Sequence, residues 1–178
     1  MLRILLIFIT LSGAVALANA VNTRSGEQDV DFYAGDLRKA QVLIEQKQFI
    51  EAHEILEELA RLDYGPAKAQ LGLLYMAGQG VDADPSVAVI WFYQAAEQGM
   101  PSAQLALAHM LMRGDGVPQD IEEAYLWLVV ARDRTTGELH ERSQALINQL
   151  GAMLDADVIT KSEAKAKQWR PNISAVVR

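Results

Sequence analysis

Apolar residues recur at helical spacing through the centre of the chain. Four of them occupy positions i, i+4, i+7 and i+8, which lie on one face of an α-helix. They are Ala67, Leu71, Leu74 and Tyr75. Gly78 and Gly80 follow, and glycine ends helices readily because it adopts left-handed backbone angles without a Cβ penalty. The pattern predicts a helix that ends at this Gly-x-Gly turn.

A second helix is predicted directly after the turn. Asp84 is a good N-cap, and Pro85 suits the first helical position because no amide hydrogen is needed there. The buried face is predicted to combine small and aromatic side chains: Ala88, Trp91, Phe92 and Ala95. The unit is predicted to end at Gly99 before Pro101 starts the next one, as Gly65 and Pro66 do one unit earlier.

The same pattern returns after 36 residues. When residues 67–96 are compared with residues 103–132, ten of thirty positions are identical. These are Ala67/Ala103, Leu71/Leu107, Met76/Met112, Gly78/Gly114, Gly80/Gly116, Val81/Val117, Asp84/Asp120, Ala88/Ala124, Trp91/Trp127 and Ala95/Ala131. In the second copy Asp120 is followed by Glu123, the spacing of a capping box. A fixed period of this length predicts a solenoid of stacked helix pairs.

The repeat resembles a known family. Residues 67–96 follow Ala-x3-Leu-Gly-x2-Tyr-x2-Gly-x-Gly-Val-x2-Asp-x3-Ala-x2-Trp-x3-Ala-Ala, which is similar to the SEL-one-like repeat, a relative of the tetratricopeptide repeat. The second copy departs from the pattern at Ala108, Leu111 and Arg132. The resemblance implies an all-α, right-handed solenoid of about four antiparallel helix pairs. It also implies a scaffold or signalling modulator of the bacterial envelope.

Further helices are predicted on both sides. Residues 37–46 and 49–62 read as a hairpin with a turn near Lys47 and Gln48, and a long helix after Gly137 is marked by Leu139, Leu146, Leu150 and Met153. A last helix begins near Asp157 or at a Thr160–Glu163 capping box and stops before Pro171. Residues 125–131 are apolar on every face, so we expect the C-terminal pair to cover them. The predicted division is 21–36 as a flexible segment, 37–66 as a tetratricopeptide-like pair, 67–102 and 103–136 as repeats, 137–170 as a capping pair and 171–178 as a tail.

The first twenty residues have the three-part pattern of a secretory signal peptide. Arg3 is the one charge, an interrupted apolar stretch follows, and Ala18-Asn19-Ala20 is a small-x-small cleavage site. A membrane anchor would need about 20 unbroken apolar residues, and a lipoprotein would need a cysteine at the cleavage site. We therefore expect a mature chain that begins at Val21, lies in the periplasm or outside the cell, and has no membrane-inserted segment.

Charge and cysteine content narrow the function classes. The formal net charge is −7, and such a chain repels phosphate backbones, which argues against a nucleic-acid partner. Residues 27–63 hold ten acids against four bases, whereas residues 132–178 hold six acids against eight bases. The chain has no cysteine, so helix packing without disulfides must hold an exported domain together.

The sequence offers no credible catalytic, cofactor or metal site. His53-Glu54 and His140-Glu141 begin like a zinc-protease motif, but the second histidine four residues later is missing in both. No cysteine nucleophile and no Gly-x-Ser-x-Gly elbow occurs. The Gly-x-Gly turns follow helices rather than strands and lack the later glycine and lysine of phosphate loops. We expect a protein that is not an enzyme.

A binding groove is predicted on the first helix of each repeat, opposite its core stripe. The residues on this face are Ala69, Leu73, Met76, Leu105, His109 and Met112. Stacked first helices would turn them into an apolar, methionine-bearing groove suited to a peptide or helix of a protein partner. The alternative is that they only contact neighbouring first helices. In an exposed groove His109 should titrate near its ordinary value of about 6.5.

The sequence thus predicts a periplasmic adaptor or regulator that binds a protein partner. The alternative is a structural component of an envelope assembly, such as the cell wall, a polysaccharide export assembly or a flagellar motor.

Overall fold

The computed structural model describes residues 33–172, and this stretch is helical without a strand. Residues 33–45 form the first helix described. The others are α2 (Phe49–Arg61), α3 (Gly65–Ala77), α4 (Pro85–Glu97), α5 (Pro101–Arg113), α6 (Ile121–Asp133), α7 (Glu138–Gly151) and α8 (Ala156–Gln168). The predicted all-α class is confirmed, whereas the predicted signal peptide lies outside the described residues.

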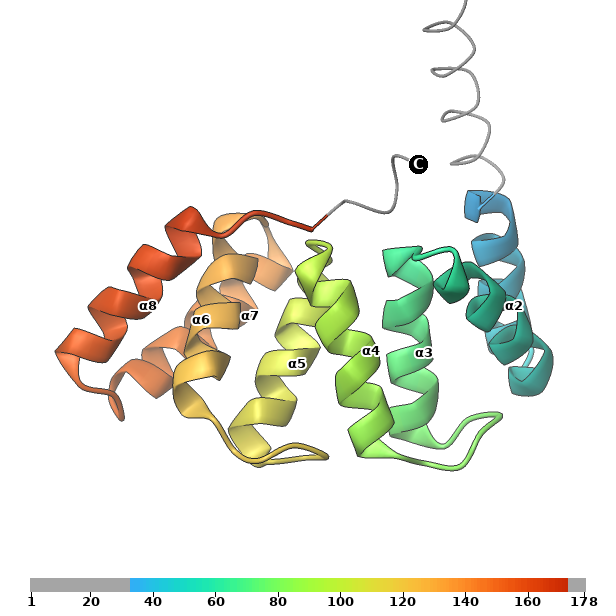
Figure 1. Ribbon diagram of the computed structural model, residues 1–178, viewed down its shortest axis with the longest axis horizontal. Helices are drawn as coiled ribbons and strands as arrows, with labels where there is room; N and C mark the ends of the chain where they lie inside the picture. The colour runs from blue at the N-terminus through green and yellow to red at the C-terminus, as the bar shows by residue number, and fades with distance from the viewer. Residues whose placement is uncertain (1–32, 173–178) are drawn as a thin grey trace, which may run out of the picture.

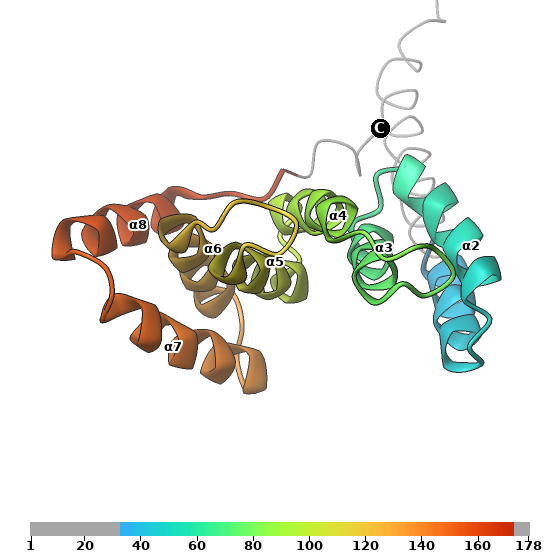
Figure 2. The ribbon, with the colours of Figure 1, turned by 90° about the horizontal axis from the view of Figure 1, so that it is seen from below.

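The helices stack in chain order as a solenoid of helix pairs (Figure 1). Within residues 33–172 four pairs follow one another, as the repeat predicted. In the view of Figure 2, α3, α5 and α7 form one layer and α4, α6 and α8 the other. Residues 33–36, expected in the flexible segment, belong to the first helix, and the turn after it places Lys47 at a φ of 61°.

The repeat turns are built largely as predicted. Gly78 and Gly114 end α3 and α5 in left-handed conformations. Asp84 accepts hydrogen bonds from the amides of Ser86 (2.9 Å) and Val87 (3.2 Å) at the start of α4. Asp120 caps α6 in the same way, accepting a bond from the Glu123 amide at 2.9 Å.

The capping box predicted at α6 is only half formed. The Glu123 carboxylate accepts a hydrogen bond from Trp127 Nε1 (3.3 Å) one turn further along the helix. The Asp120 amide, which a complete box would bind, donates instead to the carbonyl of Leu111 (3.0 Å). A carbonyl from the preceding helix has therefore taken the place of the glutamate.

Gly65 does not end a unit as predicted. It is the first residue of α3, and Asp63 takes the left-handed conformation after α2, with a φ of 61°. Asp63 lies 36 residues before Gly99, whose φ is 85°. A Cβ at Gly65 would lie 2.5 Å from Oε1 of Gln98, so that side chain would have to move. The glycine thus leaves room for the Gln98 side chain between α3 and the end of α4.

A polar latch joins α2, α3 and α4 at this point. Gln98 Nε2 donates to both the carbonyl oxygen (2.9 Å) and the carboxylate (2.8 Å) of Asp63. The buried Lys68 pairs with the same carboxylate. At the positions 36 residues later the chain has Gly99, Gln104 and Arg134 in place of Asp63, Lys68 and Gln98, so the latch is not repeated.

The core follows the prediction for α6. Residues 127–131 are all buried, along with Tyr125, because α7 and α8 both pack on this helix. Trp127 is 3% exposed, whereas Trp91 at the equivalent position of the first repeat is only partly buried. The C-terminal pair therefore closes the end of the solenoid, as expected.

The last helix starts at Ala156, close to Asp157. The alternative start, a capping box at Thr160, is wrong, because Thr160 Oγ1 donates to the carbonyl of Ala156 (2.8 Å) inside the helix. Met153, expected on the long helix before it, is an exposed residue after the end of α7.

Residues 169–172 form a segment that we name the C-terminal strap. It runs from the end of α8 back across α6 to α4 (Figure 1). The Trp169 ring packs edge-on against Trp127, with centroids 6.0 Å apart, and the Arg134 guanidinium lies 4.4 Å from its centroid. Arg134 also donates to the Trp169 carbonyl (3.0 Å), and the Asn172 amide donates to the carbonyl of Glu97 (2.7 Å). The predicted tail from residue 171 is thus tied to the fold at its beginning.

Candidate functional site

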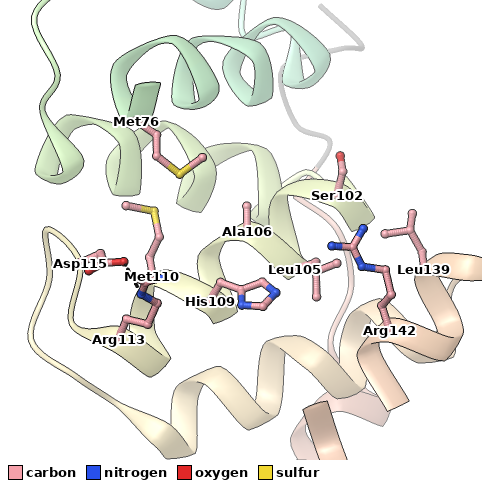
Figure 3. Close-up of a pocket in the computed structure, with 10 residues that line it drawn as sticks. All are labelled: Met76, Ser102, Leu105, Ala106, His109, Met110, Arg113, Asp115, Leu139 and Arg142. Atoms are coloured by element: carbon pink, nitrogen blue, oxygen red, sulfur yellow. Dashed lines mark ion pairs between the residues drawn. The ribbon is translucent and has the colours of Figure 1, made fainter. Parts of the chain in front are cut away.

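An open cavity of about 380 Å³ lies on the layer formed by α3, α5 and α7. Its sides come from one end of α3, the length of α5 and the start of α7 (Figure 3). The lining residues are Met76, Ser102, Leu105, Ala106, His109, Met110, Arg113, Asp115, Leu139 and Arg142. Aliphatic and methionine side chains supply most of this lining, and the charged groups stand at two ends.

The cavity brings together half of the predicted groove. Met76, Leu105 and His109 line it. Leu73 is exposed on α3 but lies outside the cavity lining. Ala69 belongs to the buried core, and Met112 is partly buried against that core. These two residues therefore pack in or against the core and do not line the cavity.

Seven of the lining residues were missed by the sequence: Ser102, Ala106, Met110, Arg113, Asp115, Leu139 and Arg142. Met110 is buried in the core and also forms part of the cavity lining. Arg113 is the last residue of α5, Asp115 belongs to the turn after it, and Arg142 comes from α7. Arg142 lies 36 residues after Ala106, but α7 repeats too little of the pattern for this spacing to have identified it.

The charges are distributed unevenly along the cavity. At one end Arg113 Nε and Asp115 Oδ2 form an ion pair at 3.0 Å. At the other end Arg142 is 3.6 Å from Glu138 on its own helix. The pKa of His109, between them, is lowered because burial disfavours the charged ring and because Arg142 and Arg113 repel a further positive charge. The expectation of an ordinary pKa at His109 is therefore corrected, and the ring is neutral at pH 7.

The other two histidines have partners that explain them without a metal. His53 Nε2 is 3.3 Å from the hydroxyl of Tyr75, and His140 Nδ1 is 3.1 Å from the carbonyl of Arg132. Among residues 33–172, no three histidine or acidic side chains are placed to hold a metal ion. Within the same stretch no helix has the length and apolar character needed to cross a membrane.

Two consecutive parts of the chain match a family model. Residues 65–100 and 101–133 each match the Sel1 repeat. The chain therefore contains two Sel1 repeats. The matched units start at Gly65 and Pro101, the first residues of α3 and α5, so each contains one complete helix pair.

Solved structures support the same fold. One is a protective antigen present in uropathogenic Escherichia coli strains that displays an SLR fold, with a TM-score of 0.72 and 24% identity over 88% of this chain. Another is a Sel1 repeat protein from Oxalobacter formigenes, with a TM-score of 0.53 and 26% identity over 61% of this chain. This chain spans 34% of the first structure and 44% of the second.

Sel1 repeats are protein-interaction modules. Proteins of this family are typically non-catalytic and scaffold-like. An open, mainly apolar cavity on the repeat helices is the feature of this chain that fits such a role.

Proposed function

We propose that this protein is a non-enzymatic periplasmic adaptor or regulator that holds a segment of a partner protein in the cavity between α3, α5 and α7. The observation that carries the proposal is the cavity, with its apolar floor and its flexible methionine rim. Methionine side chains adapt to different partner shapes, and apolar grooves between helices accept peptide segments.

The surroundings of the cavity favour a chain segment over a small enclosed ligand. Met76 at its rim is 46% exposed, and Leu73 one turn earlier on α3 is 42% exposed. Apolar side chains therefore continue beyond the cavity along the same helix. A partner segment longer than the cavity could cover these apolar side chains. A small molecule inside the cavity would leave them in contact with water.

The periplasmic part of the proposal is supported by the sequence of residues 1–20. A positive start, an apolar stretch and a small-x-small site together are typical of exported proteins. A chain without cysteine also has no thiol that an oxidising compartment could cross-link wrongly.

Photo-crosslinking in intact cells tests both parts of the proposal. A benzophenone amino acid would replace Ser102, an exposed residue at the cavity, or Ile90, which is 55% exposed on α4 outside the cavity lining. We expect a specific adduct from position 102 in the periplasmic fraction, with Val21 as the N-terminus of the crosslinked chain. Position 90 should give none.

Met76→Gln supplies the second control. Because Met76 is exposed, the change should alter the free energy of unfolding by no more than about 0.5 kcal/mol, as measured by thermal melting. It should nevertheless remove the adduct. Equal adducts from positions 102 and 90, or an adduct that survives Met76→Gln, would contradict binding in the cavity.

A further inference from the structure

The cavity carries positive charge on an acidic protein. The whole chain has a formal net charge of −7. Among the residues that line the cavity, Arg113 and Arg142 face one acid, Asp115, and His109 is neutral at pH 7. The lining therefore has a formal excess of one positive charge, which attracts groups of the opposite sign.

The two arginines are not equivalent. Arg113 is neutralised at close range by Asp115, which also lines the cavity. Arg142 has a longer contact of 3.6 Å with Glu138, whose side chain is 84% exposed, and such a surface pair contributes little. In Figure 3 the Arg142 guanidinium lies at the same end of the cavity as Ser102 and Leu139, opposite the Arg113–Asp115 ion pair. A guanidinium in that position can bind a carboxylate through two parallel hydrogen bonds.

The apolar part of the lining lies next to this charged end. Leu105 and Met110 are 5% and 3% exposed, so they form a firm floor, and Met76 covers it from α3. His109 points into the middle of the cavity between the two arginines. Burial is the main cause of its lowered pKa, and repulsion from Arg142 and Arg113 adds to it.

We propose that the cavity selects partner segments in which an acidic side chain stands close to an apolar one. The carboxylate binds Arg142, and the apolar side chain packs against Met76, Leu105 and Met110. This inference rests on the proposed function, since it names the chemistry of the segment that the cavity holds. It also gives the bound segment a direction along α5.

Three synthetic peptides provide the test on the full chain. Each is a fluorescein-labelled dodecapeptide with four leucines at the same positions, and the remaining positions are all glutamate, all glutamine or all lysine. Fluorescence polarisation at low salt should rank them glutamate, glutamine, lysine, with about a tenfold gap between the first and the last. Binding of the glutamate peptide should weaken as the salt concentration is raised, because added ions screen exposed charges.

Arg142→Gln locates the effect, and Arg61→Gln is its matched control. Arg61 is 72% exposed and pairs with Glu57 on α2, away from the cavity. Arg142→Gln should weaken binding of the glutamate peptide about tenfold, because it removes a charge-assisted hydrogen bond. It should leave binding of the glutamine peptide unchanged. Arg61→Gln should alter neither. Equal losses in the two variants would overturn the inference.

Other outcomes separate this inference from the proposed function. If the three peptides bind equally and Met76→Gln abolishes all of them, the cavity binds segments without charge selection, so the inference is overturned and the proposed function stands. If the lysine peptide binds most tightly, the inference is overturned by its sign. If no peptide binds and position 102 gives no crosslink, both are overturned.

Discussion

Two tryptophans at the same position of successive repeats have different surroundings. Trp127 lies between Tyr93 and Trp169, with both ring centroids 6.0 Å away, and its indole N–H donates to Glu123. Trp91 is partly buried against the N-terminal core. The sequence predicted a similar burial for both, because it shows the register but not the strap that covers one of them.

Truncation should therefore separate the two tryptophans. Trp127→Ala should lower the free energy of unfolding by about 3–5 kcal/mol, the usual cost of removing a large buried aromatic side chain. Trp91→Ala should cost clearly less, because part of its ring already contacts water. Urea denaturation of the two variants checks this, and equal losses would contradict the different packing described here.

His109 links stability to pH. Its pKa is lowered in the folded chain, so the unfolded chain binds more protons when the pH falls below the ordinary value of about 6.5. The stability that His109 contributes is fully present at pH values above the ordinary histidine pKa of about 6.5, which is that of the unfolded chain. It is lost as the pH falls toward the lower pKa of His109 in the folded chain. Urea denaturation at pH 7 and pH 5 should show a smaller fall in stability for His109→Gln than for the unchanged chain. An identical fall would show that other groups account for the whole dependence.

At the scale of helices, the sequence correctly predicted helix ends that are determined by the residues at the end itself. Asp84, Gly78 and Gly114 act within one turn of where they stand, so their roles follow from residue type alone. The predictions that Gly65 ends a unit and that Thr160 starts the last helix were wrong, because the same residue types also occur in other local structures. Asp63 can adopt left-handed angles as glycine does, and a Thr-x-x-Glu pattern also occurs inside helices, where threonine bonds the carbonyl one turn back.

The candidate site was half predicted because it combines three helices. Met76, Leu105 and His109 follow from the face of the repeat's first helix. Leu139 and Arg142 depend on how α7 packs, and α7 carries too little of the repeat pattern to fix its register. Ala69 and Met112 were assigned to the groove because spacing alone does not show how closely neighbouring first helices approach.

Across the whole molecule, the strap connects the C-terminal pair to the first Sel1 repeat. A Cβ on Gly99 would lie 3.1 Å from the Cβ of Pro171, so the strap would have to shift by a few tenths of an ångström to accept it. Gly99→Asp puts an aspartate at the position equivalent to Asp63, 36 residues later in the repeat. Its side chain should displace the strap. Hydrogen exchange should then become faster at the Asn172 amide, which donates to Glu97.

Gly114→Asp is the control for this change. It adds the same residue at a similar φ of 72°, but its Cβ would meet no atom closer than 3.4 Å and does not touch the strap. Both variants share the cost of a non-glycine residue in a left-handed conformation, roughly 1 kcal/mol. Faster exchange at Asn172 in both variants would mean that lost stability, rather than the contact with Pro171, releases the strap.

The strap also bears on how this repeat array could be lengthened. It reaches back from α8 over one helix of its layer and finishes where a glycine follows α4. If evolution or an engineer copied one more 36-residue unit in front of residue 137, Pro171 would arrive one unit later, at the position that Thr135 now occupies. A threonine side chain would fill the space that Gly99 leaves open. Lengthening this array therefore takes two changes, a new unit and a glycine to receive the end of the chain.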